Sequence, residues 1–531
     1  MSELDLSSRD YRAPRKIAAR LVVTGRLQLM TPAQLGNGDA ESITDMPLLL
    51  DTVEDQPRPL LSGTSIAGAL RGYLIARARG HRAAEELGRE SMADRLFGGV
   101  KGDDAGAQSP LIVDNALGEL PANVLIELRD GVKIDYATHT AQDKFKYDLE
   151  LLPAGTGFAL RLELLLPPEP EHARPLRQAL ALALSGLSPG ADGYGEIALG
   201  ARRSRGFGRC RVESWQFAEY ALTEVEGLLA WIVIDHDGWA PGPTRVWSGG
   251  PAAALGAGET AMLPEDYRRS FVISGRFALE GPLLVRSTQP LFTADEQPAG
   301  NGELQLPDVV QLRSHRPGRA SPGGAAVLPG TSLAGALRSR ATMILNTIAA
   351  GDPRGQALID EIFGLDMHRQ RQGEEPQPTG SRLIVEERPL DSGQLLVQNR
   401  VAIDRFTGGA FDTALFSEAP WFGGAVELRL ELRHDSLPQQ AELAAAQASR
   451  EQARVGLLLL LLKDLWSGDL PLGGGASVGR GRLRGLEASL RASAEREWQL
   501  GASGEGLTIE GESAAELERY IEALHTHIGA A

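Results

Sequence analysis

PLLSGTSIAGALRGYL (59–74) recurs as VLPGTSLAGALRSRAT (327–342), and this pair of segments decides the fold. Gly63 in the first segment corresponds to Gly330 in the second, at a separation of 267 residues. In each copy a Gly-Thr-Ser sequence precedes apolar residues at helical spacing, which predicts a helix with a Ser or Thr near its start. The chain therefore contains a repeated unit whose centre is a helix.

The flanking segments repeat in the same order. Upstream, RLVVTGRLQL (20–29) corresponds to SFVISGRFAL (270–279), and both alternate between apolar and polar residues as a half-buried strand does. Downstream, VKIDYAT (132–138) corresponds to VAIDRFT (401–407) at a separation of 269 residues. Nearly constant separations over successive blocks indicate a tandem duplication.

Each unit is predicted to be a ferredoxin-like (RRM-like) α+β domain, built from a strand, a helix, paired strands, a helix and a final strand. Residues 440–466, which end in a leucine-rich stretch, supply the second helix of the second unit. A short helix is expected at 514–528. The predicted divisions of the chain are a first domain, a Pro- and Gly-rich linker, a second domain and a tail, at 15–235, 236–267, 268–495 and 496–531.

Composition sets the broad class. The chain has 531 residues with 42% hydrophobic and 23% charged residues, which is ordinary globular composition. The single cysteine, Cys210, excludes an internal disulfide framework, and the longest apolar run, Leu457–Leu462, is too short to cross a bilayer. We therefore expect a cytoplasmic protein that does not contact membranes. A net charge of −16 disfavours a generic basic nucleic-acid binder, so any polyanion has to meet a local patch.

Three motifs resemble those of a known family. LPGTSLAGALR (328–338), VAIDRFTGGAFDTALFSE (401–418) and GASVGRGR (475–482) are similar to the motifs of the RAMP superfamily of CRISPR proteins. In particular, they resemble the repeated backbone subunit of type III effector complexes, and two fused copies resemble the tandem subunit of type III-D variants. The resemblance implies a ribonucleoprotein subunit whose partners are CRISPR guide RNA, complementary target RNA and other type III effector subunits.

Two glycine- and arginine-rich loops, 199–212 and 472–485, are the candidates for holding RNA. Glycine lets the backbone approach a phosphate closely while arginine neutralises it, and a helix start offers N–H groups to anions. The alternatives are an ordinary helix cap and a solvated basic loop. Aromatic residues are only 5% of the chain, so contact with the RNA backbone is favoured over base stacking. The predicted RNA-binding residues, including the arginine of the Ile-Asp-Arg motif, are Gly63, Arg71, Arg202, Arg203, Arg205, Arg209, Gly330, Arg338, Arg405, Arg480 and Arg482.

The resemblance also implies a catalytic aspartate in the loop after the first strand of each unit. Asp45 and Asp308 are at these positions, although Pro47 of the first loop has no counterpart in the second. The implied chemistry is metal-assisted attack of an RNA 2′-hydroxyl on its own phosphodiester, with Mg²⁺ or Mn²⁺ at each aspartate and no organic cofactor. A loop aspartate is also a common turn residue. Acidic neighbours that compete for the role are Asp39, Glu41, Asp51 and Glu303.

The segments 134–152 and 403–420 resemble the family's thumb, a hairpin that wedges into the guide–target duplex. Candidate wedge side chains are Phe145, Tyr147, Phe411 and Phe416, for which core packing is the alternative.

Two other functions compete with target cleavage. One is a subunit that holds guide RNA and cuts nothing. The other is a guide-processing endonuclease, which needs a histidine as general base, yet His139 and His315 do not repeat between the two units. No phosphate-binding GxxxxGK[ST] motif is present, which disfavours ordinary nucleotide-dependent enzymes.

Overall fold

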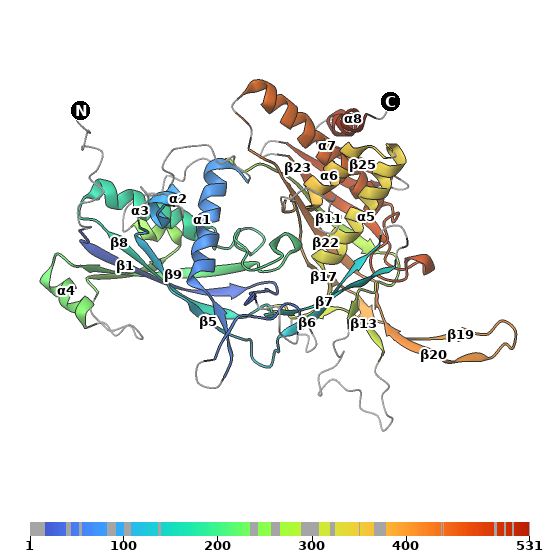
Figure 1. Cartoon of the computed structure of the whole chain (residues 1–531), viewed down its shortest axis with the longest axis horizontal. Coiled ribbons are helices and arrows are strands. Elements are labelled where there is room, and N and C mark those ends of the chain that lie inside the picture. The colour runs from blue at the N-terminus through green and yellow to red at the C-terminus, as the bar shows by residue number, and fades with distance from the viewer. Residues whose placement is uncertain are drawn as a thin grey trace.

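Two domains of the same topology lie along the chain (Figure 1). The computed structural model describes residues 16–38, 44–52, 56–81, 92–99, 108–135, 138, 140–233, 243–255, 266–287, 307–318, 324–349, 351–365, 379–436, 438, 440–492, 496–503, 506–511 and 514–529.

In the first domain, β1 (Ala19–Leu29) lies at the centre of an antiparallel sheet between β8 (Gly157–Leu166) and β9 (Cys210–Ala221). β4 (Leu111–Val113) and β5 (Ala116–Glu119) pair with β8 on its other edge. The helices of this domain are α1 (Gly63–Arg79), α2 (Met92–Phe97), α3 (Pro170–Ser185) and α4 (Val225–Ile232). The order of the strands and the two crossover helices α1 and α3 is that of the ferredoxin-like fold, which confirms the prediction.

The second domain repeats this arrangement. β11 (Ser270–Leu279) lies between β22 (Ala425–Arg433) and β23 (Leu483–Arg491), and β16 (Leu383–Val385) pairs with β22. Its helices are α5 (Gly330–Ile348), α6 (Pro353–Phe363) and α7 (Ala441–Trp466), the last of which confirms the helix expected at 440–466.

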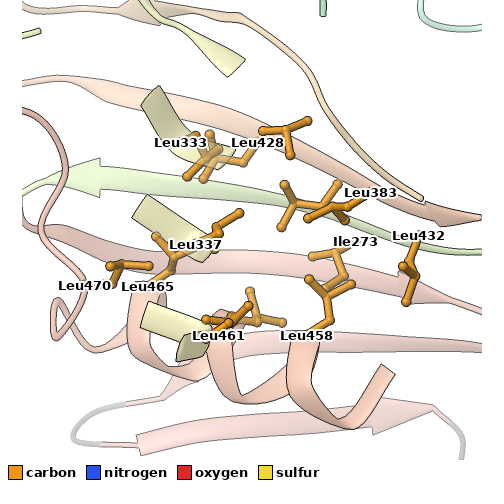
Figure 2. Close-up of a cluster of buried hydrophobic side chains, with 14 of the residues drawn as sticks. Ile273, Leu333, Leu337, Leu383, Leu428, Leu432, Leu458, Leu461, Leu465 and Leu470 are labelled. Carbon is orange, nitrogen blue, oxygen red and sulfur yellow. The ribbon is translucent and has the colours of Figure 1, made fainter. Parts of the chain in front are cut away.

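Apolar side chains from the sheet and the helices form the core of the second domain (Figure 2). Ile273 from β11 belongs to one cluster with leucines of α5 and α7, including Leu337 and Leu461, and all of these side chains are buried. Fully burying a leucine stabilises a fold by about 1.5–3 kcal/mol. The first domain has a matching core around Leu21, Val23 and the buried face of α3.

A long hairpin leaves each domain. In the first it consists of β6 (Glu127–Ile134) and β7 (Ala141–Leu151), and in the second of β19 (Gln398–Ile403) and β20 (Ala410–Ala419). Figure 1 shows β6 and β7 running from the first domain to the second, while β19 and β20 project beyond the second domain. The segments predicted as thumbs, 134–152 and 403–420, contain the turn and the second strand of each hairpin, whose first strand begins before them.

Short strands complete the sheets and the loops that carry the hairpins. They are β2 (Leu50–Asp51), β3 (Arg58–Leu61), β12 (Arg286–Ser287), β13 (Val309–Gln311), β14 (Arg313–Ser314), β15 (Ala325–Leu328), β17 (Arg388–Asp391), β18 (Gln394–Leu395) and β21 (Trp421–Phe422).

Parts of the predicted linker and tail belong to the sheets. β10 (Arg245–Gly249), inside the predicted linker, pairs with β9, and Trp247 stacks on Phe217 with ring centroids 5.5 Å apart. In the tail, β24 (Glu497–Ser503) and β25 (Gly506–Gly511) extend the second sheet from β23, and α8 (Ala514–Ile528) packs on α7. Trp247 anchors a segment within the predicted linker, and the buried Trp498 anchors the predicted tail. The helix expected at 514–528 is confirmed.

In the part of the chain that the structure describes, no helix is both long and apolar enough to cross a membrane.

Candidate nucleic-acid interface

The two predicted catalytic aspartates occupy equivalent positions. Asp45 accepts a hydrogen bond of 2.8 Å from the backbone N–H of Asp148 in β7. Asp308 accepts one of 2.8 Å from the backbone N–H of Ser417 in β20. Both aspartates are exposed, and each lies against the second strand of its own hairpin. The duplication therefore places one carboxylate at the base of each hairpin.

The missing proline does not displace the second aspartate. Met46, which follows Asp45, forms a parallel bridge with Leu149, and Val309, which follows Asp308, pairs in parallel with Glu418. The register of loop against hairpin is thus the same in both domains.

The two loops are held differently. In the first domain Glu150 accepts hydrogen bonds of 3.0 Å from the Thr44 hydroxyl and from the Leu48 N–H. The position of Glu150 is taken by the buried Ala419 in the second domain, where the Ser417 hydroxyl instead donates to Asp308 at 3.3 Å. A carboxylate stabilises the first loop, and a hydroxyl contacts the second aspartate directly.

Each aspartate can offer a metal ion one carboxylate ligand, so that water and RNA phosphates would have to supply the other ligands. Among the described residues, no group of three or more His, Cys, Asp or Glu side chains could hold a metal ion. Asp39, Glu41 and Glu303 lie outside the described residues, and Asp51 lies in β2 opposite Arg58. Mg²⁺ is commonly bound through one or two carboxylates together with water and substrate phosphates, so one exposed carboxylate fits that mode.

The helix-start glycines are explained by close packing. A Cβ atom on Gly63 would overlap the carbonyl oxygen of Val113, and one on Gly330 would overlap those of Val385 and Arg205. The Gly63 N–H donates to the Asn115 side chain at 2.8 Å. Both glycines are the first residues of their helices, and binding of RNA by these two residues stays a prediction.

Arg71 and Arg338 stabilise helix pairs within each domain. Arg71 of α1 forms an ion pair of 2.9 Å with Asp94 of α2, and Arg338 of α5 forms one of 2.9 Å with Asp360 of α6. The same contact in both repeats gives these arginines a structural role. A contact with RNA remains a prediction for them.

The two glycine-arginine loops have one backbone shape. A 3₁₀ turn at Arg203–Arg205 corresponds to one at Ala476–Val478, and each is followed by a glycine with positive φ, Gly206 or Gly479. The position of Arg202, which has φ 55°, is taken by Gly475 in the second domain. The loops therefore superimpose residue by residue, with Arg209 at the position of Arg482.

Arg205 and Arg209 lie between the two domains. Arg205 donates to the carbonyl oxygens of Leu383 at 3.0 Å and Phe363 at 3.3 Å, both in the second domain. Arg209 pairs with Glu386 at 2.8 Å and with Asp192 at 2.9 Å. Burial, together with the charges of Arg338 and Arg202, lowers the pKa of Arg205 to about 10. The main contact of this stretch is thus the second domain, and binding of RNA by Arg205 and Arg209 stays a prediction.

The other predicted arginines divide into engaged and exposed side chains. Arg202 donates to the Tyr147 hydroxyl at 2.6 Å, so Tyr147 is held at the hairpin base rather than presented as a wedge. Arg480 is 4% exposed and pairs with Glu418 at 2.8 Å. The predicted RNA-binding arginines whose side chains are exposed are Arg203, Arg405 and Arg482.

Exposed aromatic side chains mark the second hairpin. Phe411 is 54% exposed and Phe416 is 42% exposed, whereas Phe145 in the first hairpin is half-buried beneath the Lys133 ammonium. Phe406, at the turn between β19 and β20, is 88% exposed and was not among the sequence candidates. The signal that could have identified it is a lone aromatic residue in the turn sequence RFTGG (405–409).

A buried charged cluster joins the domains, and nothing in the sequence pattern indicates it. Arg129 of β6 pairs with Glu387 of the second domain and, at 2.8 Å, with Glu127. Arg316 also pairs with Glu387. All four side chains are at least nine-tenths buried. Burial by itself would lower the pKa of the Arg129 guanidinium, but the interactions with Glu387 and Glu127 raise this pKa overall.

The histidines give no support for a guide-processing site. His315 Nδ1 lies 2.7 Å from the carbonyl oxygen of Ala154, which is a contact between the domains. His139 lies outside the described residues.

A family model described as "RAMP superfamily" matches residues 26–211 and 286–484 of the chain. The matched regions lie within the two domains, the second of them beginning after β11, and each contains one hairpin and nearly all of one glycine-arginine loop. No curated protein matches the chain.

Proposed function

The chain belongs to the RAMP superfamily, and we propose that it is a tandem backbone subunit of a type III CRISPR effector complex, of the type III-D kind. In this role it binds CRISPR guide RNA and cleaves complementary target RNA at two sites. The observation that carries the proposal is the repeated pairing of an exposed aspartate with a projecting hairpin.

The hairpins would divide the guide–target duplex into segments. A protein that holds such a duplex reads its shape and backbone, while base pairing carries the sequence information. The exposed aromatic side chains of β19 and β20 could insert between base pairs, which unstacks bases next to the hairpin. An RNA backbone distorted in this way passes close to the carboxylate at the hairpin base.

Cleavage would use the RNA's own 2′-hydroxyl. Its oxygen attacks the adjacent phosphorus, the bond to the 5′-oxygen breaks, and the products are a 2′,3′-cyclic phosphate and a 5′-hydroxyl. Asp45 or Asp308 would accept the proton that the 2′-hydroxyl loses, and water would protonate the departing 5′-oxygen; the exposure of both carboxylates supports this role. Mg²⁺, when bound there, would neutralise charge on the phosphate. Each aspartate accepts a hydrogen bond from a backbone N–H, and this bond fixes the direction of the carboxylate.

RNA binding would draw on arginines that solvent can reach. Arg203, Arg405 and Arg482 are exposed, so they can contact phosphates without breaking contacts within the protein core. Phosphate contacts neutralise charge and carry no base information. Replacing Arg203 with alanine should weaken binding equally for all guide sequences and reduce its salt dependence.

Single substitutions of the aspartates test the cleavage proposal. The complex containing this chain, its guide and its partner subunits would be assembled with Asp45→Asn or with Asp308→Asn, and target products would be resolved by length. Each variant should lose one cut and keep the other, while target binding stays unchanged. Asp51→Asn is the matched control, since Asp51 lies in the same loop region but in a strand pair.

If both single variants leave every product unchanged, the cleavage proposal fails. The chain would then be a subunit that binds guide RNA without cutting the target. Removal of divalent metal with a chelator should abolish both cuts without releasing the target.

A further inference from the structure

The loop that carries Asp45 is attached to the first hairpin by main-chain hydrogen bonds. The N–H of Met46 donates to the carbonyl oxygen of Asp148 at 3.2 Å, and the N–H of Glu150 donates to the carbonyl oxygen of Met46 at 3.1 Å. Because Met46 directly follows Asp45, these bonds fix the chain on the C-terminal side of the aspartate.

The side chain of Glu150 adds a hydrogen bond on each side of Asp45. Its Oε1 atom accepts one of 3.0 Å from the hydroxyl of Thr44, and its Oε2 atom accepts one of 3.0 Å from the N–H of Leu48. Thr44 directly precedes Asp45, and Leu48 follows within the same loop. Hydrogen bonds to a charged acceptor are about twice as strong as those between neutral groups. One carboxylate therefore spans the loop, and Thr44 links it to the residue that would act on RNA.

Glu150 itself is poorly placed to contact RNA. Its side chain is half-buried, and both of its oxygens already accept hydrogen bonds from the loop. Asp45, in contrast, is exposed. An effect of Glu150 on cleavage would therefore act through the position of the loop.

The second domain holds its aspartate through a different residue. Ala419, which has no polar side chain, takes the position of Glu150. The N–H of Asp308 donates to the carbonyl oxygen of Ser417 at 3.0 Å, and the hydroxyl of Ser417 donates to Asp308 Oδ2 at 3.3 Å. A hydroxyl that touches the aspartate thus replaces a carboxylate that holds the loop.

The direction of each aspartate is important for the proposed reaction. A general base has to lie within about 2.6–3.2 Å of the group whose proton it takes. A displacement of about 1 Å can slow a reaction by about 100-fold. Both aspartates are exposed side chains, so the surrounding protein restricts them little. A contact that restricts the loop or the carboxylate should therefore raise the rate of cleavage without touching the RNA.

We propose that Glu150, acting through Thr44, is the positioning residue for Asp45, and that Ser417 is the positioning residue for Asp308. Each of the two cuts then depends on its own positioning residue and can be slowed without the other. This inference rests on the proposed function, because it concerns the rates of the two proposed cuts.

Single-turnover cleavage by the assembled complex tests the proposal. Thr44→Val removes the hydroxyl while keeping the shape of the side chain, and it leaves the hydrogen bond between Glu150 and Leu48 in place. At saturating target RNA, this variant should slow the Asp45 cut by about 10- to 100-fold and leave the Asp308 cut unchanged. Thr44→Ser restores the hydroxyl and should restore the rate. Glu150→Gln, which keeps the size of the side chain and removes its charge, should also slow the Asp45 cut alone.

The second domain supplies the reciprocal measurement. Ser417→Ala should slow the Asp308 cut and leave the Asp45 cut unchanged. Thr347→Val is the matched control, since the Thr347 hydroxyl bonds to the carbonyl oxygen of Met343 within α5, and it should change neither cut. The target concentration that gives half the maximal rate should stay the same in every variant, because none of these side chains is proposed to contact RNA.

Asp45→Asn and Asp308→Asn, measured in parallel, separate failure of this inference from failure of the proposed function. If Asp45→Asn removes a cut that both Thr44→Val and Glu150→Gln leave at the native rate, the positioning role is refuted and cleavage by Asp45 stands. Equal slowing of both cuts by Thr44→Val, or a slow Asp45 cut that Thr44→Ser does not restore, also refutes the positioning role. If neither aspartate variant removes a cut, the cleavage proposal fails, and the positioning roles fail with it.

Discussion

Replacing Glu387 with glutamine should loosen the contact between the two domains. Its carboxylate is fully buried and is the shared partner of Arg129 and Arg316, whose side chains are 5% and 7% exposed. Burial alone would raise the pKa of Glu387, but the two guanidinium groups lower it overall, so the group is charged at neutral pH. Glutamine keeps the shape and removes the charge.

The magnitude follows from counting charges in the cluster. Two arginines and two glutamates balance in the native protein, whereas Glu387→Gln leaves Glu127 alone against two buried guanidinium groups. Breaking a buried ion pair by removing one partner costs about 3–5 kcal/mol. We expect a loss of that order in the free energy of the transition that separates the domains.

Urea titration combined with small-angle scattering measures this effect. The variant should separate into two extended domains at a lower urea concentration than the native chain, with the unfolding of each domain core little changed. Glu119→Gln is the control, because its ion pair with Arg26 is exposed on both sides, and such pairs contribute at most about 1 kcal/mol. If the two variants shift the transition equally, the buried cluster does not hold the domains together.

Three further measurements follow from particular contacts. Gly63→Ala should lower the melting temperature, because its Cβ would overlap the Val113 carbonyl, while Gly68→Ala, with no atom near its Cβ in the same helix, should raise it slightly. Burial lowers the pKa of His81 to about 4 and that of His434 to about 3. Both values lie below the pKa of about 6.5 that a histidine has in the unfolded chain. The free energy of unfolding therefore has its full value above about pH 6.5 and falls as the pH decreases. Urea titrations at pH 7 and pH 5 should therefore differ by about 2 kcal/mol per histidine, and a chain with phenylalanine at both positions should lose that difference. Phe406→Ala should leave the melting temperature unchanged and reduce target cleavage without reducing guide binding, because this side chain is 88% exposed; an unchanged cleavage rate would remove it as a wedge.

The sequence was sufficient to predict the fold because the fold depends on local patterns. Alternation in 20–29 and helical spacing after Gly63 are readable from neighbouring residues, and the duplication doubled each signal. The equivalence of Asp45 and Asp308 was expected from the resemblance to the RAMP superfamily, which implies an aspartate in the loop after the first strand of each unit.

The contacts between the domains were not predictable from local patterns. Arg129 and Glu387 are separated by 258 residues, and no sequence motif links the two. The glycine-arginine loop at Arg205 looked like an RNA-binding loop because glycine and arginine suit a phosphate and a protein carbonyl equally well. The composition of such a loop indicates which groups its arginines can bond to. The fold determines whether those groups are RNA phosphates or carbonyl oxygens of the second domain. The strand β10 was missed for a related reason, since a single tryptophan holds it within a linker-like sequence.

The same position can therefore serve two purposes in the two halves of this chain. Arg209 and Arg482 are equivalent by sequence, yet the first is paired across the domain contact and the second is exposed. Asp45 and Asp308, in contrast, each accept a hydrogen bond from a backbone N–H at the same hairpin position, because the loop and the hairpin that hold each aspartate lie within one domain. Contacts inside a domain can be repeated by duplication, whereas the contact between the two domains uses these positions of the first domain and not their equivalents in the second. The aspartates for which we propose chemistry are accordingly repeated, whereas the residues that join the two domains occur in only one half.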